Sequence, residues 1–107
     1  MNGEFLRFYM QEGRKMGGVL LYEWLLEQAK RLGIHGGTAF KAMAGFGRHG
    51  VMHEAKFFEL AGDLTVEVEF IVTGDEAQKL LDTVSAAKVR IFYARVPARF
   101  GVLEGDA

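Results

Sequence analysis

Apolar and polar residues alternate along four stretches of this chain, and in two further stretches the apolar residues recur every three or four positions. Alternation places successive side chains on opposite faces of a strand, whereas the longer spacing lines one face of a helix. The pattern therefore predicts two helices, one over Val19–Leu32 and one that begins after Thr73 and fades at Ser85 and Ala86. It predicts strands over Glu4–Met10, Thr38–Phe46, Leu64–Thr73 and Lys88–Val96.

The third of these strands has the strictest alternation, with an apolar face and a face that carries Glu67 and Glu69. The first strand is largely apolar on both faces, which is typical of a central position in a sheet. Pro97 is expected to stop the last strand, because proline cannot donate to a ladder. In the first helix the apolar stripe is Leu21, Leu25, Ala29 and Leu32, and Gly33 is placed to cap its end. Thr73 and Glu76 have the spacing of a capping box.

The order β-α-β-β-α-β is that of the ferredoxin-like α+β fold, a four-stranded antiparallel sheet with both helices on one face. We expect a single domain over residues 1–107, with a core over 4–96 and a tail over 97–107. The face of the sheet that the helices leave free would carry Phe5, Tyr9, Ile71 and Phe92. An uncovered apolar face of this kind predicts assembly into an oligomer.

Composition narrows the function classes. The net charge of −1 gives no general attraction to nucleic acid or anionic lipid, and the absence of cysteine excludes disulfides and thiolate sites. No apolar run reaches the roughly 20 residues that a membrane helix needs, so membrane insertion is not expected. The first residues lack the apolar core of a signal peptide. We expect a folded protein of the cytoplasm.

One stretch, Gly33 to Gly50, has a glycine cluster at each end of its strand. Glycine permits positive φ and close approach of another group, so the stretch is either a contact surface or simply a helix stop, a bulge and a hairpin. The connection after it, Arg48 to Gly62, is the longest irregular segment, and such loops often carry binding groups.

With these residues in hand, the chain resembles the PII signalling superfamily and, more closely, its DUF190 (UPF0166) family of PII-like proteins. The resemblance spans nearly all of Glu4 to Val96 and rests on the Gly36-Gly37-Thr38 entry and the Gly45-Phe46-Gly47 exit of the second strand, on Leu20-Leu21-Tyr22-Glu23, on His53, and on Asp63-Leu64. It implies a homotrimer whose sheets line the centre, adenine nucleotides (AMP, ADP or ATP) bound between subunits, and a mobile loop that regulates a partner such as a membrane transporter or channel. It implies no catalysis.

Under this resemblance, Thr38 could offer its hydroxyl to an adenine edge, and backbone N–H groups of the Gly45–Gly47 exit could approach the nucleotide. Basic residues could reach phosphate oxygens, two of them from a neighbouring subunit. The expected nucleotide-binding residues are Thr38, Gly45, Phe46, Gly47, Arg48, His49, Lys88, Arg95 and Arg99.

The chain also departs from the resemblance. PII proteins have a glycine-rich phosphate-binding segment before the last strand, whereas this chain has Ser85-Ala86-Ala87-Lys88, in which only Lys88 is a candidate. The loop lacks the tyrosine that is modified in some PII proteins. Thr65 stands where a proline is common, and Lys41-Ala42 replaces an Arg-Gly pair.

Three other functions were weighed against the sequence, and one of them, metal binding, stays an alternative. His49 and His53 have the i, i+4 spacing of a metal site, with His35 or Glu54 as a third ligand. An RNA-binding sheet is disfavoured, because the Gly45-Phe46-Gly47 motif lacks the flanking basic and aromatic residues of that signature. Acyl phosphate hydrolysis is disfavoured, because no Arg/Asn pair stands where that chemistry needs it.

Overall fold

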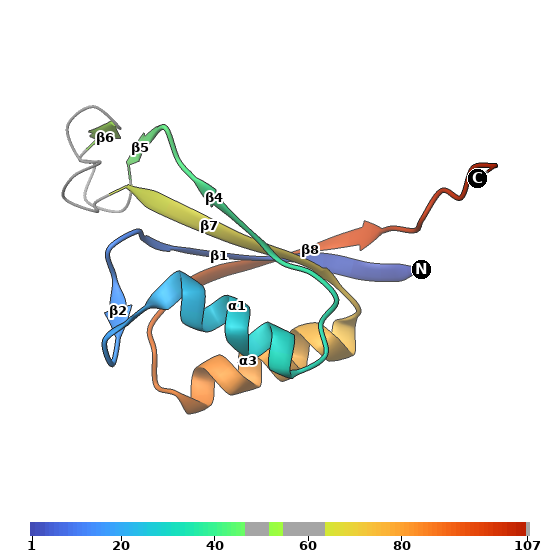
Figure 1. The fold of residues 1–107 in the computed structure, drawn as a ribbon, viewed down its shortest axis with the longest axis horizontal. Coiled ribbons are helices and arrows are strands. Elements are labelled where there is room, and N and C mark those ends of the chain that lie inside the picture. The colour runs from blue at the N-terminus through green and yellow to red at the C-terminus, as the bar shows by residue number, and fades with distance from the viewer. Residues whose placement is uncertain (47–51, 55–63, 107) are drawn as a thin grey trace.

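The computed structural model describes residues 1–46, 52–54 and 64–106 (Figure 1). Ten elements follow one another along the described chain: β1 (Asn2–Gln11), β2 (Lys15–Met16), β3 (Val19–Leu20), α1 (Leu21–Arg31), β4 (Thr38–Lys41), β5 (Ala44–Phe46), β6 (Met52–Glu54), β7 (Thr65–Val72), α3 (Gly74–Ala86) and β8 (Phe92–Arg99).

The main sheet has the strand order β4-β7-β1-β8, and every neighbouring pair is antiparallel. Both helices lie on one side of this sheet (Figure 1). The ferredoxin-like α+β fold is therefore confirmed, and so is the central position of β1, which pairs with β7 on one side and β8 on the other. Two further pairs, β2 with β3 and β5 with β6, form small separate sheets.

The second expected strand is divided in two. Residues Thr38–Lys41 pair with β7, whereas Ala44–Phe46 leave the main sheet and pair with β6. The division occurs because β7 begins at Thr65. The backbone N–H of Ala42 donates to the Thr65 carbonyl at 2.8 Å, and beyond this bond the described part of the main sheet offers no further partner. The prediction of one continuous strand was wrong for this reason.

The last strand begins and ends later than expected, and Pro97 lies inside it. Proline is tolerated at a sheet edge, where one side of the strand has no ladder to make. In the described sheet β8 pairs only with β1, and Pro97 lies opposite Glu4. The expectation that Pro97 ends the strand was therefore wrong, and the tail begins after Arg99.

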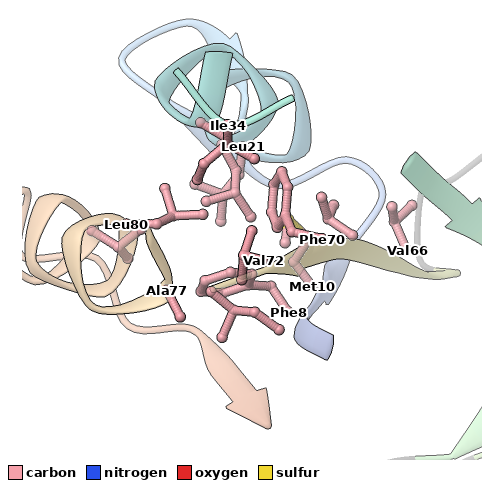
Figure 2. Packing of buried hydrophobic residues seen from close by; sticks show 14 residues of the cluster. Phe8, Met10, Leu21, Ile34, Val66, Phe70, Val72, Ala77 and Leu80 are labelled. Carbon is pink, nitrogen blue, oxygen red and sulfur yellow. The ribbon is translucent and has the colours of Figure 1, made fainter. Parts of the chain in front are cut away.

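The core fills the space between the sheet and the two helices (Figure 2). Alternate residues of β1 and β7 point into it, and each helix contributes one stripe of its surface. The rings of Phe8 and Phe70 meet edge to face at its centre, with 6.1 Å between centroids. Leu32, expected in the stripe of α1, follows the helix and is exposed. The buried residues include Leu6, Phe8, Met10, Leu21, Leu25, Ala29, Val66, Val68, Phe70, Val72, Ala77, Leu80 and Val84.

The helix ends follow the expected chemistry. The Thr73 hydroxyl accepts from the Glu76 N–H at 3.2 Å, and the Glu76 carboxylate accepts from the Thr73 N–H at 2.9 Å, which completes the capping box. At the end of α1, Gly33 has φ of 83°, and the N–H of Ile34 donates to the carbonyl of Ala29 at 3.1 Å. Glycine is suited to this left-handed position.

Lys88 has the left-handed conformation at the end of α3, with φ of 57°, although it carries a side chain. Because such a conformation costs a residue with a Cβ about 1 kcal/mol relative to glycine, Lys88→Gly is expected to raise the free energy of unfolding by about that amount. Urea denaturation measures the change. The control is Ala87→Gly at φ of −78°, which is expected to be destabilising. A Lys88→Gly variant no more stable than the wild type would contradict the prediction.

Candidate functional site

One face of the main sheet is not covered by α1 and α3, and we call it the helix-free face. Apolar side chains lie on this face on β1, β7 and β8. The strand register places Phe5 between Ile71 and Val96, and Tyr9 between Glu67 and Phe92. The four apolar residues expected there from the sequence, Phe5, Tyr9, Ile71 and Phe92, are therefore confirmed on one face. Phe92 and Ile71 are well exposed, and the rings of Tyr9 and Phe92 contact each other with 5.8 Å between centroids.

A small charged cluster crosses the middle of this face. The guanidinium of Arg7 lies 3.3 Å from a Glu67 oxygen and 3.6 Å from a Glu69 oxygen, and it stacks over the Phe5 ring at 5.0 Å. One cation thus faces two carboxylates, so the centre of the helix-free face is slightly acidic.

At the β4 edge of the same face there is a hollow of about 540 Å³. Its walls come from the connection between α1 and β4, from β4 itself and from β7. It is lined by His35, Gly36, Gly37, Thr38, Phe40, Glu69 and Ile71. We call this hollow the β4-edge hollow. Its volume lies in the range of small-molecule sites.

Gly37 shows why the entry to β4 needs small residues. A Cβ at this position would lie 2.4 Å from the Phe70 ring and 3.1 Å from a Leu26 methyl. The chain therefore passes directly over the core at the floor of the hollow, and a side chain at residue 37 would have to displace buried Phe70. Gly37 therefore serves packing, in addition to any contact with a ligand, whereas a Cβ at Gly36 would meet no described atom within 4 Å.

The polar groups of the hollow favour a neutral, hydrogen-bonding ligand surface. Thr38 contributes a hydroxyl, which donates and accepts, and Glu69 contributes a carboxylate, which only accepts. The Glu69 carboxylate, which is also paired with Arg7, can accept hydrogen bonds from amino and hydroxyl groups, and His35 adds an imidazole to the lining. These groups can form hydrogen bonds with a base and a sugar.

Two other residues were expected from the sequence to bind the nucleotide together with Thr38. These residues, Gly45 and Phe46, lie in β5, outside the main sheet. A Cβ at Gly45 would meet no described atom of this protomer within 4 Å, so packing against the described residues does not require glycine there. Gly47, Arg48 and His49 lie outside the described residues. Their expected role in binding phosphates stays a prediction.

The three remaining expected residues, Lys88, Arg95 and Arg99, lie on or before β8. In the strand order β8 and β4 are at opposite edges, so one protomer does not bring these residues to the β4-edge hollow. Arg95 is also engaged on the helix side of the sheet: its Nη2 donates to Glu4 at 3.0 Å and its Nη1 to Gln78 at 3.2 Å. The hydrogen bond to Glu4 raises the pKa of Arg95, against a smaller opposing effect of desolvation, so Arg95 stays charged.

The metal hypothesis rests on residues that the structure covers only in part. His53 belongs to β6, where its backbone lies opposite Gly45, and His49 lies outside the described residues. Among the side chains that the structure does describe, no three histidine or carboxylate groups gather into a metal-binding cluster.

Sequence reasoning missed Glu69 and Phe40 as residues of the hollow. The signal was present in the alternation: Glu69 and Ile71 occupy the outward positions of β7, and β7 is the strand next to β4. What the pattern could not supply was the register, which places Thr38 directly opposite Glu69.

None of the helices in the described part of the chain is long and apolar enough to cross a membrane.

The fold is similar to that of a solved PII-like protein. A crystal structure from Thermus thermophilus, provisionally assigned as a PII-like signalling protein, superimposes with a TM-score of 0.59 at 20% identity and covers 91% of this chain and 89% of that one. At this level of identity the likeness establishes the fold.

Sequence comparison then gives the family. Residues 3–93 match the model of DUF190, described as "Uncharacterized ACR, COG1993". A UPF0166 protein of Aquifex aeolicus is 33% identical over 81 residues, 76% of this chain and 77% of that protein. A UPF0166 protein of Methanocaldococcus jannaschii is 32% identical over 81 residues, 76% of this chain and 74% of that protein. The chain belongs to the DUF190 family.

Proposed function

We propose that this protein is a PII-like sensor of adenine nucleotides, which binds AMP, ADP or ATP between the subunits of a homotrimer and regulates a partner protein through the segment that follows β4. The observation that carries the proposal is the β4-edge hollow, which has the Thr38 hydroxyl and the Glu69 carboxylate on its wall and opens beside the exposed apolar face.

The side chains of the β4-edge hollow are chemically complementary to the base and the ribose of an adenine nucleotide. Adenine has both donors and acceptors on its edge, which suit a threonine hydroxyl, and ribose hydroxyls can donate to a carboxylate. Phe40 and Ile71 offer apolar surface to the base. In this proposal the β4-edge hollow holds the nucleoside part, and the phosphates extend away from Glu69 toward basic groups.

The basic groups are the reason for placing the site between subunits. Arg99 lies at the end of β8 and Lys88 lies shortly before β8, which is at the opposite edge of the main sheet from β4. A neighbouring subunit whose β8 side approaches the β4-edge hollow would complete the site with these cations. Arg95 would join them only if it exchanged Glu4 for a phosphate.

The helix-free face supports the trimer. A monomer would expose Phe92, Ile71 and Phe40 on one face, around the cluster of Arg7, Glu67 and Glu69, and exposed apolar side chains gathered on one face commonly mark an interface. In a trimer these residues would line the centre. We assign the protein no catalytic role, and its output is regulation of a partner, for which a membrane transporter or channel is one candidate class.

The direct test is calorimetry with AMP, ADP and ATP on wild type and Thr38→Val. Valine keeps the shape of threonine and removes the hydroxyl, so the variant should fold normally and lose one hydrogen bond to the ligand. We expect nucleotide affinity to fall about tenfold, which corresponds to about 1.4 kcal/mol.

Thr65→Val is the matched control, because Thr65 lies on the same face of β7 as Glu69 but outside the β4-edge hollow. It should bind nucleotide as the wild type does. If folded wild-type protein binds none of the three nucleotides, the proposed function is wrong. If Thr38→Val and Thr65→Val bind equally well, nucleotide binding stands but the assignment of Thr38 does not.

A further inference from the structure

One row of side chains crosses the helix-free face from β8 to β4. The register places Ala94, Arg7, Glu69 and Thr38 side by side in that order, one on each strand of the main sheet. Glu69 and Thr38 line the β4-edge hollow, and Arg7 is not among its lining residues. Arg7 therefore lies directly behind Glu69 as seen from the hollow.

The strand pairing brings the side chains of Arg7 and Glu69 close together. The N–H of Glu12 donates to the Leu64 carbonyl at 2.8 Å, in continuation of the register between β1 and β7. Hydrogen-bonded and non-hydrogen-bonded pairs alternate along an antiparallel ladder, so Arg7 and Glu69 form a non-hydrogen-bonded pair. In pairs of this kind the opposite side chains approach each other most closely.

Three neighbours hold the guanidinium of Arg7. It stacks over the Phe5 ring at 5.0 Å, its Nε lies 3.3 Å from a Glu67 oxygen, and its Nη2 lies 3.6 Å from Oε1 of Glu69. The Nε atom is shielded from solvent and, within the described part of the chain, donates no hydrogen bond. The guanidinium thus faces Glu69 from the β1 side, whereas the β4-edge hollow lies on the β4 side of β7.

The Glu69 carboxylate keeps acceptor sites for a ligand. Its side chain is 19% exposed, and its separation of 3.6 Å from Arg7 is an ion pair but too long for a hydrogen bond. None of the described residues donates a hydrogen bond to this carboxylate. Because each of its two oxygens can accept more than one hydrogen bond, Arg7 can anchor the carboxylate without blocking it.

We propose that Arg7 is a positioning residue for the nucleoside, which holds the Glu69 carboxylate where it accepts a hydrogen bond from a ribose hydroxyl. This inference rests on the proposed function and adds that the site distinguishes ribonucleotides from deoxynucleotides. A carboxylate that is already anchored loses less side-chain freedom when the ligand binds. Without Arg7, Glu67 and Glu69 would repel each other on the same face of β7, and Glu69 would turn away from its present position.

The test compares the affinity for one nucleotide with the affinities for its 2′-deoxy and 3′-deoxy forms. The nucleotide is whichever of AMP, ADP and ATP the wild type binds most tightly in calorimetry. Because a hydrogen bond to a charged group is a strong one, we expect at least one deoxy form to bind the wild type about tenfold more weakly. Arg7→Met keeps an unbranched stem and should reduce this preference to about twofold. Arg7→Lys keeps a cation, and its preference should lie between the two.

The measured quantity is a ratio of two affinities for the same protein, so a general change in trimer stability does not alter it. Glu67→Gln is the matched control. It changes the other carboxylate beside Arg7, outside the lining of the hollow, and should keep the preference of the wild type. The double variant Arg7→Met/Glu69→Gln should have the same preference as Glu69→Gln alone, because Arg7 acts through Glu69.

The possible failures are distinguishable. A folded wild type that binds none of the three nucleotides would overturn the proposed function and this inference together. A wild type that binds the nucleotide and both deoxy forms equally well would overturn the inference alone. An Arg7→Met variant that keeps the preference of the wild type would also overturn it, because Glu69 would then hold its position without Arg7.

Discussion

Replacement of Phe70 by alanine is expected to lower the free energy of unfolding by about 3–5 kcal/mol. Phe70 is 1% exposed, packs edge to face on Phe8, and supports the chain at Gly37, where even a Cβ would be too close to its ring. Truncation therefore removes apolar contacts from both the core and the floor of the β4-edge hollow, and it leaves a cavity that the rigid sheet cannot fill. Denaturant unfolding followed by circular dichroism measures the loss.

Ile71→Ala is the matched control for this prediction. It is the next residue of β7, but its side chain points to the helix-free face and is half exposed. Unfolding measured on dissociated protein should show a loss of no more than about 1 kcal/mol for this variant. A similar loss for both variants would mean that the two faces of β7 do not differ in burial, which would contradict the packing described above.

The sequence was sufficient to predict most of the fold because the main strands have distinct surroundings on their two faces. In Leu64–Thr73 every second residue meets the helices, so selection for apolar residues at those positions leaves a pattern that can be read directly. The capping box at Thr73 was equally readable, because it depends on residues only three positions apart. Such features need no knowledge of the rest of the chain.

The errors arose where a distant partner decides the outcome. Whether Ala44–Phe46 continue the main sheet depends on where β7 begins, and whether Pro97 stops β8 depends on β8 being at an edge. Neither is visible in the local residues. The same limitation applies to the candidate site: Thr38 was identified from its motif, but its neighbour Glu69 is set by the strand register.

The second large effect is expected on the dissociation constant of the proposed trimer. Phe92→Glu places a carboxylate at the centre of the proposed trimer, on a side chain that is 72% exposed in the protomer. The new charge would lie on the same face as Glu67 and Glu69, where Arg7 already serves both carboxylates. Because an uncompensated charge in an interface costs about 3–5 kcal/mol, the dissociation constant of the trimer should rise at least about 100-fold, while each protomer stays folded.

Analytical ultracentrifugation over a range of concentrations measures this change, and Phe46→Glu provides a closely matched control. Phe46 is 70% exposed, so the chemical change and the initial exposure are nearly the same, but it lies in β5, outside the main sheet. The wild type and Phe46→Glu should remain trimeric at concentrations at which Phe92→Glu is monomeric. If Phe92→Glu assembles as the wild type does, the helix-free face does not hold the subunits together.

Since the proposed phosphate-binding cations must come from a neighbouring subunit, monomeric Phe92→Glu should also lose nucleotide binding although Thr38 and Glu69 are intact.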